Sequence, residues 1–299
     1  NLIKKAIELG DSKNIVLSGG CALNCVANYE YLKHLPEGYK LYVEPMSTDA
    51  GTAAGMALHN YYTLSNSHHI NPLKTLYLGP TREYYAPSDS YSAEVSDVVD
   101  VIQKGNAVAL FQGRSEQGPR ALGNRSLLFD PTIPDARVQV NKIKLRESFR
   151  PFAATVLAEH VHEWFDMRGM EDSPFMMYAV DVLEDKRDVI SGVVHVDGTC
   201  RIQTVTKEQN ENYYNIIKEF YDRTGVPMLF NTSLNLSGDT MAETIKDVLY
   251  IIDNSGVNYL YLPEHARMVC REDNNNKHKK GYADNSIFVG SLPYHHKSV

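Results

Sequence analysis

The chain gathers arginines in one glycine-broken stretch. The segment FQGRSEQGPRALGNRSLL, at 111–128, carries Arg114, Arg120 and Arg125 between two apolar runs. A guanidinium presents a planar fork of donors that fits the oxygens of phosphate or carboxylate. Glycines let the backbone approach a ligand closely. Although the formal net charge is −7, a few arginines in a cleft act on their own ligand, so this stretch predicts a local anion site.

Three further polar groups lie beside predicted strands. Pro151 disfavours the helical conformation at Arg150, so a charged, helix-like approach ends at that arginine. Ligands of α/β proteins commonly bind at loops where strands end, so we expect all the groups to share one anion site. For each group alone, the alternative is a solvated surface charge. The three groups are Lys142, Lys144, Arg146 and Arg150 in NKIKLRESFRPFA, Arg201 in HVDGTCRIQTV, and Asn231, Thr232, Ser233 and Asn235 in FNTSLN.

Two features near the start of the chain are typical of phosphate contact. Ser18-Gly19-Gly20 stands between a predicted strand and a predicted helix, where backbone N–H groups and the helix dipole favour anions. Asp49 occupies the corresponding point of the next unit and could hold a cation that bridges phosphates. The competing interpretations are an ordinary glycine loop and a simple helix cap at Thr48 or Asp49.

Composition narrows the class of protein. With 299 residues, 43% hydrophobic and 22% charged, the chain reads as globular, and its length favours two domains. The acidic balance disfavours a nucleic-acid partner, and no apolar run is long enough to suggest a membrane span. Four cysteines are too few for a disulfide scaffold, so we expect a reducing, cytoplasmic setting. Cys21 and Cys25 are interpreted as small buried residues rather than metal ligands.

Strand and helix patterns alternate, which predicts an α/β fold. Strands are expected at 14–17, 39–45, 106–113, 150–158, 173–182, 226–235 and 257–262, and helices at 21–35, 46–62, 96–105, 207–225 and 241–256. The His68-His69 pair falls in a polar stretch and is interpreted as solvated loop. The phosphate-binding GxxxxGK[ST] loop, the GxSxG elbow and the HExxH motif are all missing from the sequence.

Six motifs, taken in order, resemble those of the O-carbamoyltransferases of nodulation-factor and antibiotic tailoring. The resemblance runs from about residue 11 to 262. It implies the end of an actin-like, sugar-kinase-like domain at 1–75, a linker at 76–90, a YrdC-like α/β domain at 91–263 and a polar tail at 264–299. The motifs are SGGCALNCVAN, STDAGTAAG, FQGRSEQGPRALGNRSLL, KLRESFRPFA, HVDGTCRIQTV and FNTSLN.

The resemblance also implies a reaction. Carbamoyl phosphate and ATP would form carbamoyl-adenylate and pyrophosphate, and a metal-assisted step, with iron or magnesium, would pass the carbamoyl group to a small-molecule hydroxyl. Asp49 matches the family's metal-ligating aspartate, while Gly19, Gly20 and Asn24 would touch the nucleotide in the first domain. Arg114, Glu116 and Arg125 are second choices as site walls. The residues implied for the carbamoyl phosphate and ATP site are Arg120, Lys144, Arg150, Arg201, Asn231 and Ser233, with the first three also implied in catalysis.

The sequence departs from the family pattern in its first domain, of which only the last two strand–helix units are expected here. The family's metal-ligating histidines have no counterpart, so the metal site is expected to be incomplete and acceptor transfer to need more than this chain. A homodimer is a further expectation. Two other functions stay open: a threonylcarbamoyl-adenylate synthase for tRNA, and a nucleotide-binding module without catalysis.

Overall fold

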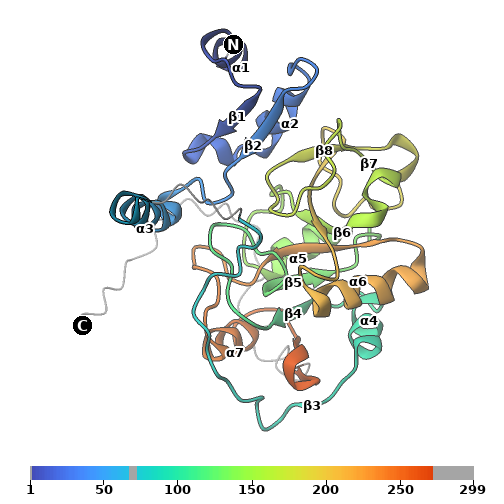
Figure 1. Cartoon of the computed structure of the whole chain (residues 1–299). Coiled ribbons are helices and arrows are strands. Elements are labelled where there is room, and N and C mark those ends of the chain that lie inside the picture. Colours follow the sequence, from blue (N-terminus) through green and yellow to red (C-terminus); the bar gives the residue numbers. More distant parts are fainter. Residues whose placement is uncertain (1, 67–72, 272–299) are drawn as a thin grey trace.

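The computed structural model describes residues 2–66 and 73–271. It contains a small α/β segment at the N-terminal end and one large mixed sheet with helices packed on it (Figure 1). The fold is therefore mixed α/β, as the alternating pattern predicted. The His68-His69 pair lies outside the described residues.

The N-terminal segment holds a two-stranded parallel sheet, in which Asn14 lies opposite Lys40. After the first helix, strands and helices alternate, because each apolar strand ends in a polar turn that leads into the next helix. Its elements are α1 (Leu2–Leu9), β1 (Asn14–Leu17), the 3-10 helix η1 (Gly20–Leu23), α2 (Cys25–Leu32), β2 (Lys40–Val43) and α3 (Asp49–Ser65).

The helix expected to start at residue 21 begins instead at Cys25. Asn24 is the reason: its side chain accepts the backbone N–H of Ala27 at 3.1 Å, which fixes the helix N-terminus there. Cys21 lies in η1 and is exposed, so the prediction that both cysteines are buried is wrong for Cys21. Thr48 caps α3 by accepting the N–H of Ala50 at 3.2 Å.

The large sheet has ten strands in the order β3-β12-β11-β4-β5-β10-β6-β9-β8-β7. Two neighbouring pairs, β11–β4 and β6–β9, are parallel, and the other pairs are antiparallel. The strands are β3 (Tyr91–Ser92), β4 (Val108–Phe111), β5 (Arg125–Phe129), β6 (Ala153–Leu157), β7 (Phe165–Asp166), β8 (Ala179–Val182), β9 (Thr199–Val205), β10 (Met228–Ser233), β11 (Tyr259–Leu262) and β12 (Arg267–Cys270).

Amphipathic helices cover the sheet. The helices are α4 (Val95–Gln103), α5 (Ala136–Ile143), α6 (Glu211–Thr224) and α7 (Ile245–Asp253), with short 3-10 turns η2 (Ala158–Glu163), η3 (Glu184–Lys186) and η4 (Pro263–His265). Helix α6 packs on β6 and β10 and beside α4. It ends at Gly225, whose φ of 74° suits glycine. No helix in the described ranges is both long and apolar enough to cross a membrane.

The structure corrects one expected boundary. The polar tail was predicted from residue 264, yet η4 and β12 continue the fold through Cys270. Strand β12 is the antiparallel neighbour of β11, with Met268 and Val269 fully buried. The sequence did not predict this strand, because its two buried apolar residues are a short pattern next to the charged sequence that follows. The stretch 76–90, expected as a linker, contains no helix or strand.

Candidate functional site

Five of the predicted site residues line one cavity of about 380 Å³. They come from four parts of the chain: the loop between β4 and β5, the segment after α5, and strands β9 and β10. The five are Arg120, Arg150, Arg201, Asn231 and Ser233, and the cavity is completed by Pro119, Ala121, Arg146, Phe149, Pro151, Met176 and Thr232. Residues distant in sequence thus share one site.

The sheet register explains why β9 and β10 contribute together. Asn231 pairs with Ala153, and Ala153 pairs with Arg201, so the three form a row across β10, β6 and β9. Directly paired residues project on the same face, and two strand spacings separate the outer two by roughly 10 Å. Ala153 lies between them, and Met176 packs against its small side chain. The row therefore holds an amide and a guanidinium at opposite sides of one hollow.

Four arginines meet in the cavity with little negative charge to balance them. Arg201 makes no side-chain hydrogen bond or ion pair to any described residue, and its buried Nε has no partner. Within the described ranges, Arg120 donates only to the Leu23 carbonyl, at 3.3 Å, and to the Cys25 sulfur, at 3.7 Å. Arg150 alone has a carboxylate partner, the exposed Glu147 at 2.8 Å. Unpaired cations that converge in this way favour an anionic ligand.

Arg146 is the fourth of these arginines. It belonged to the basic group noted in the sequence but not to the set chosen for the site. Its Nε donates to Asn141 Oδ1 at 2.6 Å, and its guanidinium lies over the Phe152 ring at 4.4 Å. Its spacing from Arg150, with Pro151 ending the segment, was the signal that could have identified it.

Mutual repulsion and burial shift the pKa values of these groups. Burial and, after it, the neighbouring Arg120 together lower the pKa of Arg201 to about 10. The pKa of Arg146 is also lowered to about 10, by burial and then by Arg150. A lowered arginine pKa means that the charged form is disfavoured here. A bound anion would remove that penalty.

Lys144, predicted as catalytic, lies behind the cavity rather than in its lining. It is 2% exposed. Its ammonium donates to the Ser233 carbonyl and to Asn235 Oδ1, the latter at 2.9 Å, and lies 3.3 Å from Ser233 Oγ. Burial and, to a smaller extent, the nearby charge of Arg146 lower its pKa to about 7. In this arrangement Lys144 holds the β10 loop in place, and its catalytic role stays a prediction.

The second-choice residues of the arginine-rich stretch build its loop. One oxygen of buried Glu116 accepts the N–H groups of Leu122 and Asn124, at 2.7 and 2.8 Å. Arg114 donates to the Gly79 and Leu78 carbonyls. A Cβ at Gly123, where φ is 114°, would come within 2.2 Å of the Tyr213 ring on α6. These contacts fix the path of the loop that carries Arg120.

Gly19, Gly20 and Asn24 do not line the cavity. No atom lies within 4 Å of where a Cβ would stand on either glycine, so their backbone is accessible to a ligand. Asn24 is the cap of α2. The link to the cavity passes through their neighbours: Cys25 Sγ donates to the Met176 carbonyl at 3.3 Å.

The described residues do not fit a resident metal. Asp49 is exposed at the start of α3. No group of three or more His, Cys, Asp or Glu side chains with metal-site geometry occurs in the ranges that the structure covers. One carboxylate does not make a coordination sphere, so no step of a reaction is assigned to a metal on this chain.

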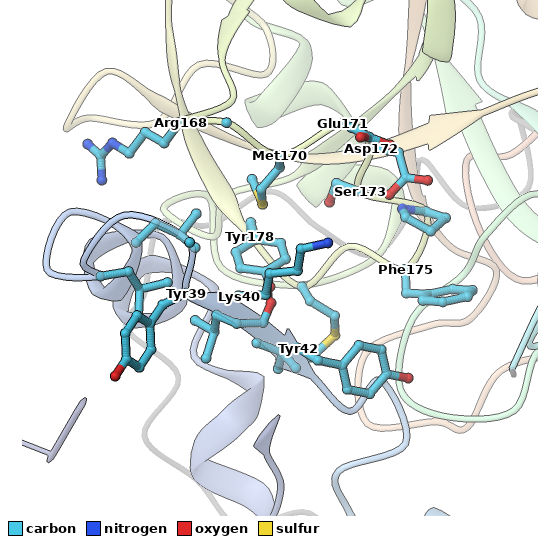
Figure 2. A pocket seen from close by; sticks show the side chains of 18 of the residues that line it. Tyr39, Lys40, Tyr42, Arg168, Met170, Glu171, Asp172, Ser173, Phe175 and Tyr178 are labelled. Atoms are coloured by element: carbon cyan, nitrogen blue, oxygen red, sulfur yellow. Dashed lines mark hydrogen bonds between the residues drawn. The ribbon is translucent and has the colours of Figure 1, made fainter. Parts of the chain in front are cut away.

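A larger cavity, of about 640 Å³, lies between β2 and the segment 168–178 (Figure 2). Tyr39, Lys40 and Tyr42 are on one side of it, and Asp172 and Tyr178 are among the residues on the other. Burial raises the pKa of Asp172, helped by Glu171. Although it is larger, this cavity is lined by none of the predicted site residues and has no comparable group of unpaired donors, so we place the candidate site in the arginine cavity.

Comparison with known proteins shows which family this arrangement belongs to. A family model described as "Carbamoyltransferase C-terminus" matches residues 99–268, and one described as "Carbamoyltransferase N-terminus" matches residues 2–58. The chain belongs to the carbamoyltransferase family. The C-terminal match includes every residue that lines the arginine cavity.

Relatives in this carbamoyltransferase family are longer. The nodulation protein NolNO of Sinorhizobium fredii is 36% identical over 266 residues, which cover 83% of this chain and 39% of that protein. The 3'-hydroxymethylcephem-O-carbamoyltransferase of Streptomyces clavuligerus is 34% identical over 245 residues, which cover 81% of this chain and 46% of that enzyme. The chain thus spans less than half the length of these curated relatives.

Among solved structures, full-length HypF in its phosphate- and nucleotide-bound form matches with a TM-score of 0.39 and 14% identity, covering 58% of this chain and 24% of that one. Likeness at this level carries no argument about the fold or the function.

Proposed function

We propose that the arginine cavity binds carbamoyl phosphate and ATP and forms carbamoyl-adenylate with release of pyrophosphate. The observation that carries the proposal is the set of four converging arginines, of which three have no carboxylate partner within the described residues. Both substrates are polyanions, and a preorganised set of cations binds them and stabilises the charge that develops on their leaving groups.

Atom balance defines the overall step. Carbamoyl phosphate, ATP and one water give carbamoyl-adenylate, pyrophosphate and inorganic phosphate: the carbamoyl–phosphate linkage breaks, and a carbamate oxygen becomes bonded to the α-phosphorus of ATP. Two phosphate-bearing molecules need more room than one small cavity gives. A second cavity of about 380 Å³, lined by residues such as Glu116 and Asn235, adjoins the first and shares Pro119 and Ser233 with it.

The two segments of the chain correspond, in this proposal, to the end of an actin-like domain and a YrdC-like domain. In full-length members of the family, the carbamoyl group would then pass to the hydroxyl of a small acceptor molecule. The name of the cephem relative, 3'-hydroxymethylcephem-O-carbamoyltransferase, supports this choice of acceptor. In this proposal the transfer step needs residues beyond this chain, because Asp49 belongs to no group of three or more metal-ligating side chains among the described residues.

Isotope exchange tests the adenylate-forming half. The folded chain, incubated with ATP, Mg²⁺, carbamoyl phosphate and labelled pyrophosphate, is expected to incorporate label into ATP only when carbamoyl phosphate is present. Arg201→Met should abolish the exchange. Arg223→Met should retain it, because Arg223 is on α6 in exposed ion pairs with Asp100 and Glu219. Absence of exchange in a folded wild-type sample that binds both substrates would refute the proposal.

A further inference from the structure

Asn231 is one of the residues that line the arginine cavity, and it carries a buried hydrogen-bond acceptor that is unpaired among the described residues. Its side chain is fully buried. Its Nδ2 donates to the Ala121 carbonyl at 3.2 Å and to Thr155 Oγ1 at 2.9 Å, with a longer contact to Gln203 Oε1 at 3.4 Å. Its Oδ1 has no partner among the described residues. A buried acceptor left unpaired is unfavourable, so this oxygen calls for a ligand.

The orientation of the amide follows from its neighbours. The Ala121 carbonyl can only accept, so the amide nitrogen must face it. The single hydroxyl proton of Thr155 goes to Gln203 Oε1 at 2.9 Å, so that hydroxyl accepts from Asn231. Gln203 in turn donates to the Leu122 carbonyl at 2.9 Å. The network is complete on the nitrogen side and leaves the oxygen free on the other.

The unpaired atoms around the cavity together describe a ligand. Arg120 Nε and Arg201 Nε are buried donors without partners, and Asn231 Oδ1 is a buried acceptor without one. A ligand that satisfies all three carries anionic oxygens and, a short distance from them, an N–H group. A carbamoyl phosphate has this combination in one small molecule. In ATP the adenine amino group is separated from the phosphates by the ribose.

We propose that Asn231 is a specificity-determining residue: its Oδ1 accepts a hydrogen bond from the carbamoyl NH₂ group and so selects carbamoyl phosphate over acyl phosphates that lack an N–H. This inference rests on the proposed function. Acetyl phosphate is the informative competitor, because it has nearly the same shape and charge but a methyl group where carbamoyl phosphate has NH₂. A methyl group against Asn231 would leave the oxygen unpaired, and sites built to hydrogen-bond an N–H discriminate strongly against analogues without it.

The test is calorimetric titration of the folded chain with carbamoyl phosphate, acetyl phosphate and inorganic phosphate. Wild type is expected to bind carbamoyl phosphate about tenfold or more tightly than acetyl phosphate. Asn231→Leu, nearly the same shape but without the acceptor, should reduce the ratio to about twofold or less. Asn231→Asp keeps an acceptor oxygen, so it should retain the preference while weakening the binding of all three anions through its added negative charge.

The outcomes separate this inference from the proposed function. If wild type binds carbamoyl and acetyl phosphate equally, or if Asn231→Leu keeps the preference, the inference is wrong and the proposed function stands. If wild type binds neither carbamoyl phosphate nor inorganic phosphate, both fail. Should Asn231→Leu not fold, as judged by circular dichroism, the ratios in wild type and Asn231→Asp decide, and loss of the preference in Asn231→Asp overturns the inference.

Discussion

Arg125 and Arg201 both have largely buried guanidinium groups, but they differ in how many hydrogen-bond partners the protein gives them. Arg125 donates to four backbone carbonyls, of Gln112, Asn124, Gly113 and Glu243, at 2.5 to 3.3 Å. It also lies 3.9 Å from the centre of the Phe111 ring. Arg201 has no side-chain hydrogen-bond partner among the described residues, and the charge of Arg120, which lines the same cavity, lowers its pKa.

The difference separates a charge used for folding from one kept for a ligand. The carbonyls around Arg125 replace the water that burial removed, so its charge holds the loop and β5 together. The charge of Arg201 is left uncompensated, which costs stability and leaves binding energy for an anion. Burial and charge alone do not distinguish the two roles; the count of hydrogen-bond partners does.

Arg125→Met should have the largest effect on stability. It removes the donors from four buried carbonyls while keeping most of the side-chain volume, and the loss is expected to be about 3–5 kcal/mol in the free energy of unfolding. Urea denaturation monitored by fluorescence measures it. A loss below about 1 kcal/mol would mean that Arg125 is not the structural member of the pair.

Arg201→Met should leave the free energy of unfolding unchanged or raise it, because it removes a partly buried cation that is unpaired among the described residues. Binding of carbamoyl phosphate should weaken by about 10- to 150-fold, corresponding to lost hydrogen bonds to a charged group worth about 1.5–3 kcal/mol. The same denaturation series and calorimetry supply both numbers. If this variant is destabilised as much as Arg125→Met, the distinction between a structural Arg125 and a ligand-binding Arg201 is wrong.

Lys144 sharpens the comparison, because it is hydrogen-bonded like Arg125 and burial lowers the pKa of both groups. Its pKa is lowered from the ordinary value of 10.5 to about 7 in the folded protein, so between these pH values the unfolded state binds more protons. Stability therefore rises with pH through this window, by at most about 1.4 kcal/mol per pH unit from this group.

The measurement is urea denaturation of wild type and Lys144→Met at several pH values from 7 to 10. The difference between the two free energies of unfolding should shift in favour of wild type as the pH rises. A difference independent of pH would show that the pKa of Lys144 is not lowered.

Lys218→Ala should have the smallest effect and sets the scale for a solvated cation. Lys218 pairs with Asp222 one turn along α6, with both side chains largely exposed. Such pairs contribute about 0.3–0.5 kcal/mol, and less at high salt. Thermal denaturation should detect a shift of this size or none. A larger loss of stability would mean that an exposed ion pair contributes as much to folding as hydrogen bonds in the interior.

Much of the site could be predicted because its motifs stand at strand ends. The fold class and the grouping of Arg120, Arg150, Arg201 and Asn231 followed from alternating elements and clustered donors. What the sequence could not supply was the direction of each side chain. Lys144 and Arg146 are two residues apart, yet the lysine points behind β10 and the arginine points into the cavity.

Local hydrogen bonds and long-range pairing account for the remaining differences. The start of α2 depends on one side-chain bond from Asn24, which competes with the helical pattern of the preceding residues. Strand β12 exists because β11 offers it an edge, and such pairing is not visible in a short polar segment. The domain identities and the roles of the site residues stay predictions.

The contact between Gly123 and the Tyr213 ring has a consequence for the order in which the protein is made. A chain synthesised from its N-terminus presents the arginine-rich stretch long before α6 exists to support it. The cavity also draws on β9 and β10, which emerge on either side of α6. Contacts between distant segments form slowly, so anion binding is a property that the nascent chain acquires only near completion of the large sheet, and it reports on correct assembly of that sheet.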